Sequence, residues 1–407
     1  MTTTINNEHK KLNVPNVRFP EFKGEWEEHY LSDYLDFKNG LNPKPDKFGK
    51  GIKFISVMDI LNNTVITNDC IRASVDVTEK ELSDFSVEKG DMLFQRSSET
   101  LEDVGRANVY MDDKTAVFGG FVIRGKKKGE YDPQYFNYLL RSPFARKRII
   151  PMGAGAQHFN IGQEGLSKVK LHFAIIEEQN KIGKMLSLLD ERISFQNKII
   201  EDLKKLKCAI IDYTIDSIQA DYTEFETMYV AAGEGGTPST SKKEYYEDGR
   251  IPFVKIEDLK QKYLVSNKDY ITELGLQKSS AWLIPTNSIL FSNGATIGEI
   301  SITTYPVCTK QGILGIVPKA DIDTEYLYYL MSSRYFKKEI CRIITEGTMK
   351  TAYLKDINKI RCPIPSKAVQ QEIVRIPSAL NTKIETEQSI LNKLICQKQY
   401  LLRQMFI

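Results

Sequence analysis

Polar and basic side chains recur in the segments of this sequence that are poor in apolar residues. Gln, Asn and Arg make paired hydrogen bonds with base edges, and Lys, Ser and Arg hold phosphate oxygens, so these residue types on loops suit contact with a nucleic acid. In the first half of the chain the candidates are Gln95, Arg96, Ser97, Ser98, Arg106, Lys126, Lys127, Lys128, Gln157, His158 and Asn160. In the second half they are Ser239, Thr240, Lys242, Lys243, Ser292, Asn293, Lys310, Thr348 and Lys350. Any one run is most simply a solvated surface, but recurrence in both halves favours a binding role.

The overall charge does not by itself demand a nucleic acid. Lys and Arg number 56 and Asp and Glu number 53, which gives a net charge of +3. Basic residues do cluster locally, because the segment from Arg141 to Arg148 carries four of them and another group lies from Arg334 to Lys338. Such clustering is what a binding surface for phosphates requires.

Motifs that carry catalysis are missing. The sequence has no GxxxxGK[ST] phosphate loop, no Gly-x-Ser-x-Gly nucleophile elbow and no Asn-Pro-Pro-aromatic motif of adenine methyltransferases. Its six cysteines form no CxxC pair, and none of its four histidines lies near a cysteine, so no metal site is expected. We therefore expect no catalytic residues and no cofactor in this chain.

Length and composition indicate a globular protein of several domains. With 407 residues, two or three domains are expected, and 41% hydrophobic and 27% charged residues are ordinary for globular chains. The first residues are polar, with no apolar signal-peptide core, and no apolar run is long enough to cross a bilayer. We expect a cytoplasmic protein without a membrane partner.

The sequence contains an internal duplication, which must position the polar loops. At an offset of 191 residues, Tyr135, Tyr138 and Leu139 align with equivalent residues of the second half, and Gln179 aligns with Gln370. Towards the start of each half the best offset becomes 199, so the two copies differ there by insertions. One unit is therefore present twice, with its C-terminal end better matched than its N-terminal end.

Each copy ends in a long amphipathic helix. Apolar residues follow alternating three- and four-residue spacing, which is the pattern of a coiled-coil seam. The predicted seam positions are Leu186, Leu189, Ile193, Gln196, Ile200 and Leu203 in the first helix, and Leu380, Ile384, Glu387, Leu391, Leu394 and Leu401 in the second. Polar residues interrupt both seams at matching places, which favours two helices packed on each other over two separate helices that cap their own domains.

The remainder of each copy is a mixture of helices and strands. Short alternating segments such as 53–57, 91–94 and 288–291 predict strands, and 132–150 and 323–344 predict helices whose tyrosines belong to the core. Pro377 stands where the first copy has Leu186, and a proline inside a helix costs about 3 kcal/mol. We expect the second long helix to start or kink there.

Three motifs resemble those of a known family, the specificity (S) subunits of type I restriction-modification systems. The segment from Pro15 to Glu27 resembles the family's opening motif, and Glu178-Gln-Asn-Lys-Ile182 resembles the start of its central helix. Gly235-Gly-Thr-Pro-Ser239 resembles the entry to its second target recognition domain. The resemblance covers nearly the whole chain from Val14 onward.

This resemblance implies an α+β fold, with two pseudo-repeated mixed α/β target recognition domains joined by two long helices packed as an antiparallel coiled coil. The implied division is a flexible arm at 1–14, domain one at 15–174, spacer helix one at 175–214, domain two at 215–366 and spacer helix two at 367–407. Each domain would read one half of a split, asymmetric site in double-stranded DNA.

The resemblance also implies partners. Two modification (M) subunits would bring S-adenosylmethionine, and restriction (R) subunits would bring ATP and Mg²⁺. One alternative is a recognition subunit of another multi-subunit restriction-modification system. Another is a coiled-coil scaffold that does not bind DNA, which predicts no steep dependence of DNA binding on salt.

Overall fold

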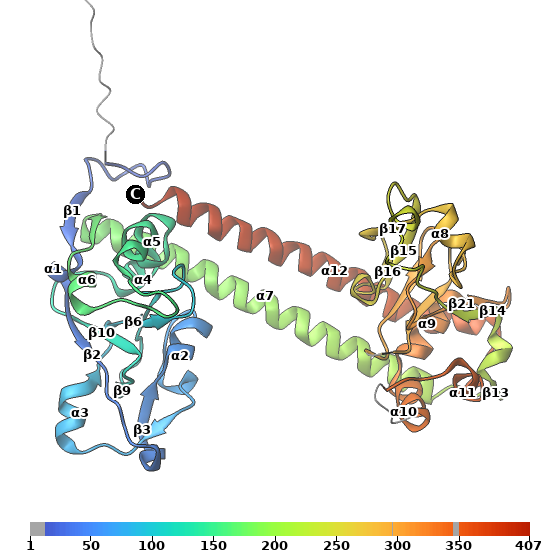
Figure 1. The fold of residues 1–407 in the computed structure, drawn as a ribbon. Helices are drawn as coiled ribbons and strands as arrows, with labels where there is room; N and C mark the ends of the chain where they lie inside the picture. The colour runs from blue at the N-terminus through green and yellow to red at the C-terminus, as the bar shows by residue number, and fades with distance from the viewer. Residues whose placement is uncertain (1–12, 295, 345–349) are drawn as a thin grey trace, which may run out of the picture. The chain divides into compact units, whose positions relative to one another are not determined.

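The computed structural model describes residues 13–294, 296–344 and 350–407, and these residues form two compact units (Figure 1). The first comprises residues up to Asn197 together with Ser389–Ile407, and the second comprises Lys198–Gln388. The two long helices, α7 (Ile176–Asp216) and α12 (Lys367–Gln404), each contribute one segment to each unit. No helix of the described residues is long and apolar enough to cross a membrane.

The first unit contains a four-stranded antiparallel sheet in the order β2-β10-β6-β8 and a second four-stranded sheet in the order β4-β3-β9-β5. Its strands are β1 (Glu27–Tyr30), β2 (Leu35–Asn39), β3 (Phe48–Ile55), β4 (Ser74–Val75), β5 (Ser86–Val87), β6 (Met92–Gln95), β7 (Ser97–Ser98), β8 (Ala107–Val109), β9 (Ala116–Phe118), β10 (Val122–Lys127), β11 (Phe159–Asn160) and β12 (Lys170–Phe173). Its shorter helices are α1 (Leu31–Tyr34), α2 (Val57–Asn62), α3 (Glu79–Phe85), α4 (Pro133–Arg141), α5 (Pro143–Ile149) and α6 (Gln163–Ser167).

The second unit contains a five-stranded sheet in the order β14-β21-β18-β19-β16 and a three-stranded sheet in the order β17-β15-β20. Its strands are β13 (Tyr222–Glu224), β14 (Tyr229–Glu234), β15 (Ile251–Val254), β16 (Tyr263–Leu264), β17 (Asp269–Ile271), β18 (Ile289–Ser292), β19 (Ile300–Thr303), β20 (Cys308–Thr309), β21 (Ile313–Pro318) and β22 (Arg361–Pro363). Its shorter helices are α8 (Glu273–Gln277), α9 (Thr324–Ser332), α10 (Arg334–Ile343) and α11 (Leu354–Ile357).

The duplication is visible at the start of each long helix. Gln179 accepts a hydrogen bond from the backbone N–H of Asp132 (3.1 Å) and donates to the carbonyl of Ala174 (2.8 Å). Gln370 repeats both contacts in the second unit, on Asp323 (2.7 Å) and Pro365 (2.9 Å). The same amide side chain therefore ties each domain to the first turn of its long helix.

Each helix predicted over 132–150 and 323–344 is instead a pair of helices, α4 with α5 and α9 with α10. The pairs are separated at Ser142 and Ser333, which have extended backbone and whose side chains cap the following helix by accepting hydrogen bonds from Ala145 N–H and Phe336 N–H (3.2 Å each). A serine with this geometry ends one helix and begins the next. Tyr135 and Tyr138 of α4 and Tyr326 and Tyr329 of α9 are buried in the two cores, as predicted.

The opening motif is anchored on α7. The buried carboxylate of Glu178 accepts two hydrogen bonds from Arg18 (2.8 Å each) and a third from the Trp26 indole N–H (3.2 Å). These donors compensate a carboxylate that has no exposure to solvent, and the hydrogen bonds to Glu178 raise the pKa of Arg18.

The long helices pair along the predicted seam. In the first unit, Leu186, Leu391 and Leu394 are buried, and in the second unit Ile200 and Ile384 are buried. The remaining apolar seam positions are partly buried, and the polar positions Gln196 and Glu387 are buried as well. Because early residues of α7 lie beside late residues of α12 in the first unit, and the order is reversed in the second, the pairing is antiparallel.

The second long helix does not start at Pro377. It begins at Lys367, and Pro377 lies buried in its interior. The physical reason is upstream, because Gln370 fixes the first turn of α12 on Asp323 and Pro365 before the proline is reached. A bend of the helix axis at Pro377 stays a prediction.

Candidate nucleic-acid interface

In the first unit, the fold brings together polar residues that are far apart in sequence. Strand β7, which holds Ser97 and Ser98, pairs with β11, which ends at Asn160. The Ser97 hydroxyl donates a hydrogen bond to the Asn160 side-chain oxygen, and Asn160 is exposed. Ser97, Ser98 and Asn160, with the neighbouring exposed Gln157 and His158, form a polar surface that we call the domain-one face.

Gln95 and Arg96 support this face from the end of β6. Gln95 is buried and donates to the carbonyl of Ser97 (2.9 Å), while its own side-chain oxygen has no hydrogen-bond partner among the residues that the structure describes. Arg96 donates to the carbonyl of Gly120 (3.3 Å) and is half-buried. Gln95 therefore positions β7, and Arg96 borders the face.

The lysine run 126–128 lies at the opposite end of the sheet. Strands β6 and β10 are antiparallel, with Gln95 opposite Val122, so the C-terminal end of β10 lies away from the domain-one face. Lys126 pairs with Glu88 (3.4 Å), Lys128 pairs with Asp36 (3.0 Å), and Lys127 donates to the carbonyl of Tyr131 (2.9 Å). The structure thus separates these candidates from Gln95–Ser98 and engages each within its own domain.

In the second unit, a tight backbone approach places two candidate segments side by side. A Cβ on Gly235 would lie 2.3 Å from the carbonyl oxygen of Thr309, so only glycine allows the chain to pass there. Thr237 accepts a hydrogen bond from the Gln311 N–H (3.3 Å), so the segment that continues to the exposed Ser239 and Thr240 passes the segment that holds the exposed Lys310. The nearby Lys242 lies over the ring of Tyr245, and Lys243 pairs with Glu247 (3.7 Å).

Ser292 and Asn293 are buried and hold loops in place. Ser292 accepts a hydrogen bond from Glu299 N–H (2.8 Å), and Asn293 donates to the carbonyl of Ala352 (3.2 Å). Ser292 thus holds the loop that leads to Glu299, and Asn293 holds the segment that follows the exposed Lys350; both side chains are buried. Thr348 lies outside the described residues.

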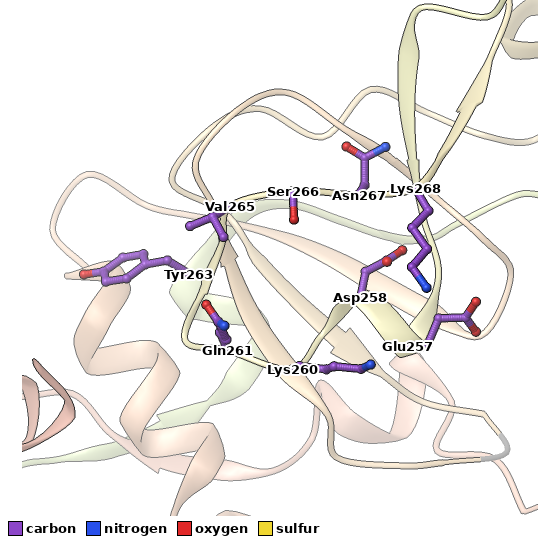
Figure 2. Close-up of a pocket in the computed structure, with 9 residues that line it drawn as sticks. All are labelled: Glu257, Asp258, Lys260, Gln261, Tyr263, Val265, Ser266, Asn267 and Lys268. Carbon is purple, nitrogen blue, oxygen red and sulfur yellow. The ribbon is translucent and has the colours of Figure 1, made fainter. Parts of the chain in front are cut away.

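A polar pocket opens elsewhere on the second unit, between Glu257 and Lys268 (Figure 2). Its side chains serve the local fold: Asp258 accepts from the Lys255 N–H (2.9 Å), and Asn267 accepts from the Tyr305 hydroxyl (2.9 Å). Among the described residues there is no group of three or more His, Cys, Asp or Glu side chains that could hold a metal ion. All six cysteines are unpaired.

The candidates omitted two arginines of the first unit. Arg141 and Arg146 line a pocket with Arg106, which was a candidate and which forms an ion pair with Asp103 (2.6 Å). The sequence signal was the basic run from Arg141 to Arg148. That run does not reveal that two of its members line a pocket together with Arg106.

Comparison with known proteins identifies the class. The family model described as type I restriction modification DNA specificity domain matches residues 23–205 and again 229–395. The chain belongs to this family and is a type I restriction-modification specificity subunit with two recognition domains.

Individual relatives agree with this assignment. The putative type I restriction enzyme MjaX specificity subunit of Methanocaldococcus jannaschii is 25% identical over 402 residues, covering 93% of this chain and 92% of the relative. The EcoR124I/EcoR124II specificity subunit of Escherichia coli is 31% identical over 173 residues, covering 40% and 42%.

Solved structures share the fold. The crystal structure of the type I restriction-modification S subunit from M. genitalium matches with a TM-score of 0.58 at 18% identity, covering 97% of this chain and 99% of that one. A structure from a study of assembly and conformational transition of the type I system matches with a TM-score of 0.61 at 14% identity, covering 93% and 96%.

Proposed function

We infer that this chain is the DNA-reading subunit of a type I restriction-modification complex, in which each domain reads one half of a split, asymmetric DNA site. The observation that carries this proposal is the duplicated attachment, in which Gln179 and Gln370 tie equivalent domains to the starts of two antiparallel helices. Two equivalent readers on a shared helical spacer suit a target made of two separated halves.

The domain-one face supplies suitable chemistry for base readout. Asn160 and Gln157 are exposed amides, and amides pair with adenine edges in the major groove. Ser97 and Ser98 are hydroxyl donors and acceptors that suit either bases or phosphates. In domain two, the segments holding Ser239 and Lys310 offer the corresponding types of side chain.

The long helices offer docking surfaces for the modification subunits. Besides its buried seam, α7 exposes large apolar side chains at successive intervals of seven, four, seven and seven residues, a spacing that suits a further helix. These residues are Leu188 and Phe195 in the first unit and Ile199, Leu206 and Tyr213 in the second. Two modification subunits would dock here and bring S-adenosylmethionine, and restriction subunits would bring ATP and Mg²⁺. Because the partners would carry out the chemistry, the chain itself would be non-catalytic. The complex would act in the cytoplasm.

The test is to co-express the chain with the modification subunit encoded beside it, in a host without adenine methylation, and to map methyladenine across the genome. A split motif that disappears when this chain is omitted is the expected result. The matched control replaces residues 15–174 with the first domain of another specificity subunit, which should change one half of the motif only. Soluble, associated proteins that leave no new methylation would contradict the proposal and favour a scaffold.

A further inference from the structure

Three arginines of the first domain converge on one pocket at the edge of its main sheet. Arg106 precedes β8, Arg141 ends α4 and Arg146 lies in α5, and all three line a pocket of about 420 Å³. The remaining walls come from apolar residues and one acidic residue, namely Ile60, Leu61, Ala107, Leu140, Ile150 and Glu102.

Arg141 and Arg146 are held only by neutral groups. Arg141 donates to the carbonyls of Ala107 and Asn63 (3.2 Å each), and Arg146 donates to the carbonyls of Val104 (2.6 Å) and Glu102 (2.9 Å). Within the described part of the chain, neither guanidinium forms an ion pair with a carboxylate, and the Nη1 donor of Arg146 is buried without a hydrogen-bond partner. A buried donor without a partner is costly and indicates a missing acceptor.

The electrostatics of the pocket point to an anion. Burial and the neighbouring Arg106 together lower the pKa of Arg146 to about 10, against an opposing effect of Asp103. Burial also lowers the pKa of Arg141. By contrast, Arg18 in the same unit faces the carboxylate of Glu178, and its pKa is raised. Asp190 and Asp103 act on Arg141 and Arg146 from a distance, but burial outweighs them and lowers both pKa values, so an anion in the pocket would stabilise the two cations.

The pocket and the domain-one face are linked through neighbouring backbone segments of β6 and β8. The Gln95 N–H donates to the carbonyl of Arg106 (2.8 Å), and the Gly105 N–H donates to the carbonyl of Gln95 (2.9 Å). Gln95 in turn holds Ser97, so the pocket and the face share the same end of β6 and β8. A ligand that lies along the domain-one face would reach Arg106 next.

We propose that Arg106, Arg141 and Arg146 form a clamp for one backbone phosphate of the DNA half-site that domain one reads. This proposal rests on the proposed function. Guanidinium groups match phosphate oxygens with paired donors, and the exposed Arg106 presents such donors to an incoming phosphate. A phosphate contact positions the domain on the duplex and carries no sequence information of its own.

The described residues of domain two do not repeat these three arginines. The backbone contact of Gln95 with Arg106 is repeated by Ser292 with Glu299 (2.9 Å), so an acidic residue stands at the position of Arg106. At the offset of 191 residues, Ser332 and Lys337 stand at the positions of Arg141 and Arg146. The clamp is therefore specific to the half-site of domain one.

The experiment uses the complex of the full chain with its modification subunit and the target found by methylation mapping. A series of duplexes each carries one neutral methylphosphonate in place of a phosphate. We expect one such position in the domain-one half-site to weaken binding about tenfold in the wild-type complex. Arg106→Gln and Arg146→Gln should weaken binding to the unmodified duplex about tenfold, reduce the salt slope by about 0.9, and abolish sensitivity at that position alone.

Controls separate the clamp from general charge and from folding. Arg148→Gln removes the same charge from α5 outside the pocket and should keep the sensitive position. Arg106 is exposed, so its variant should fold even if Arg146→Gln does not, and Arg146→Lys keeps the charge while removing the paired donors.

Each outcome decides the matter. Unchanged affinity and unchanged phosphate sensitivity in the folded Arg106→Gln complex would overturn the clamp while the proposed function stands. The same result, combined with a rise in the melting temperature of the wild type but not of Arg146→Gln on addition of inorganic phosphate, would assign the pocket to a free anion instead. If the wild-type complex shows no sequence preference at all, the proposed function fails, and the clamp fails with it.

Discussion

The two units attach their domains to the long helices at the same positions but with different chemistry. In the first unit, Asp190 of α7 accepts a hydrogen bond from the Tyr138 hydroxyl (2.7 Å) and pairs with Lys398 of α12. Lys398 also lies over the Tyr138 ring, 5.5 Å from its centre. The carboxylate in this tie belongs to the long helix.

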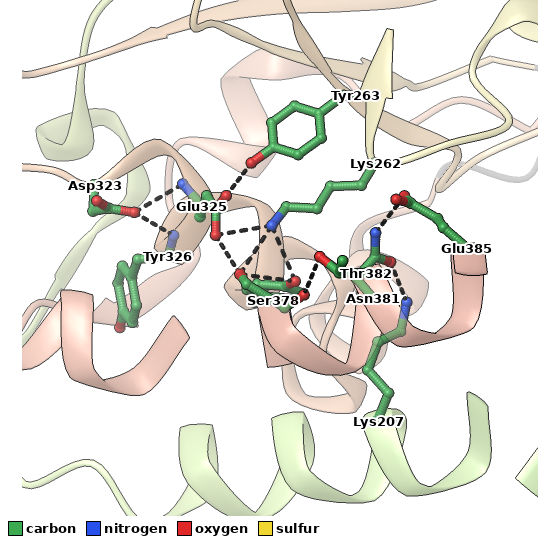
Figure 3. A network of polar contacts seen from close by, with 11 residues as sticks. Lys207, Lys262, Tyr263, Asp323, Glu325, Tyr326, Ser378, Asn381, Thr382 and Glu385 are labelled. Atoms are coloured by element: carbon green, nitrogen blue, oxygen red, sulfur yellow. Dashed lines mark hydrogen bonds and ion pairs between the residues drawn. The ribbon is translucent and has the colours of Figure 1, made fainter. Parts of the chain in front are cut away.

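In the second unit, the carboxylate comes from the domain (Figure 3). Asn381 stands at the position of Asp190 and accepts from Lys207 (3.0 Å), while Lys262 is buried beside Glu325 (2.8 Å) and donates to Tyr329 (3.1 Å) and Ser378 (3.0 Å). Burial lowers the pKa of Lys262. Burial acts to raise the pKa of Glu325, but hydrogen bonds from Lys262 and its neighbours outweigh it and lower that pKa.

Both units therefore have a polar contact between the domain and the long helices at this position, but they form it with different residues. We call this contact the tie. A tyrosine from the equivalent helices α4 and α9 takes part in both ties. The carboxylate lies on different elements in the two copies, and we attribute this difference to Glu385. Asn381 donates a hydrogen bond to Glu385 one turn later (2.7 Å), where the first copy has Ser194. An aspartate at position 381 would face Glu385, so the second copy places its carboxylate on the domain.

The largest effect is expected from Glu325→Ala. It leaves the buried Lys262 without its counter-ion, which should destabilise the second unit by about 3 kcal/mol. Because two units need not unfold together, the measurement is hydrogen exchange of the α9 amides. Gln134→Ala, at the equivalent position of the first unit, is the matched control and should have little effect. A similar loss in both variants would show that the network has no special role.

The double variant Lys262→Met with Glu325→Leu sharpens this result. Replacing a buried ion pair by apolar residues of similar volume is often neutral, so most of the lost stability should return. The same amide exchange measures it. If the double variant is as unstable as Glu325→Ala, the loss comes from packing and not from the unpaired charge.

Asp190→Asn should cost the first unit about 1.5–2 kcal/mol, because Lys398 and Tyr138 lose a charged acceptor. This substitution gives the first unit the residue that the second has at position 381. Protection of the α4 amides should fall while that of α9 stays constant. An unchanged α4 would mean that the two ties are not equivalent.

The reverse substitution, Asn381→Asp, should give no stabilisation despite the nearby Lys207. The new carboxylate gains Lys207 and repels Glu385, so a change within about 0.5 kcal/mol is expected. Adding Glu385→Ser should then make the aspartate stabilising. A gain from Asn381→Asp alone would contradict our account of why the charge moved.

The smallest effect concerns pH. The folded-state pKa of Glu325 lies below its ordinary value of 4.5, so its contribution is present above that pH and is lost as the pH falls through the lowered pKa. The second unit should therefore lose stability below about pH 4.5, and Glu325→Gln should reduce that pH dependence. Melting curves recorded between pH 3 and pH 6 provide the measurement, roughly spanning this window. Equal pH dependence in both proteins would assign the acid loss to other carboxylates.

Much of the helical framework could be predicted from the sequence, because it depends on local periodicity. The seam positions from Leu186 to Leu401 follow a repeat that one face of a helix must satisfy. The duplication at an offset of 191 residues predicted two domains, each followed by a long helix. The start of α12 could not be predicted in this way, because a glutamine contact with Asp323, and not the proline, determines where it begins.

The sequence alone determined the repeated unit, the coiled-coil seam and the types of polar side chain available for binding. Only the tertiary structure decided which of them meet: Ser97 with Asn160, Arg106 with Arg141 and Arg146, and Lys262 with Glu325. It also placed Lys126–Lys128 at the opposite end of the sheet from Gln95–Ser98. The physical reason is that sheet register and helix packing bring together residues tens of positions apart, and no local pattern records those pairings.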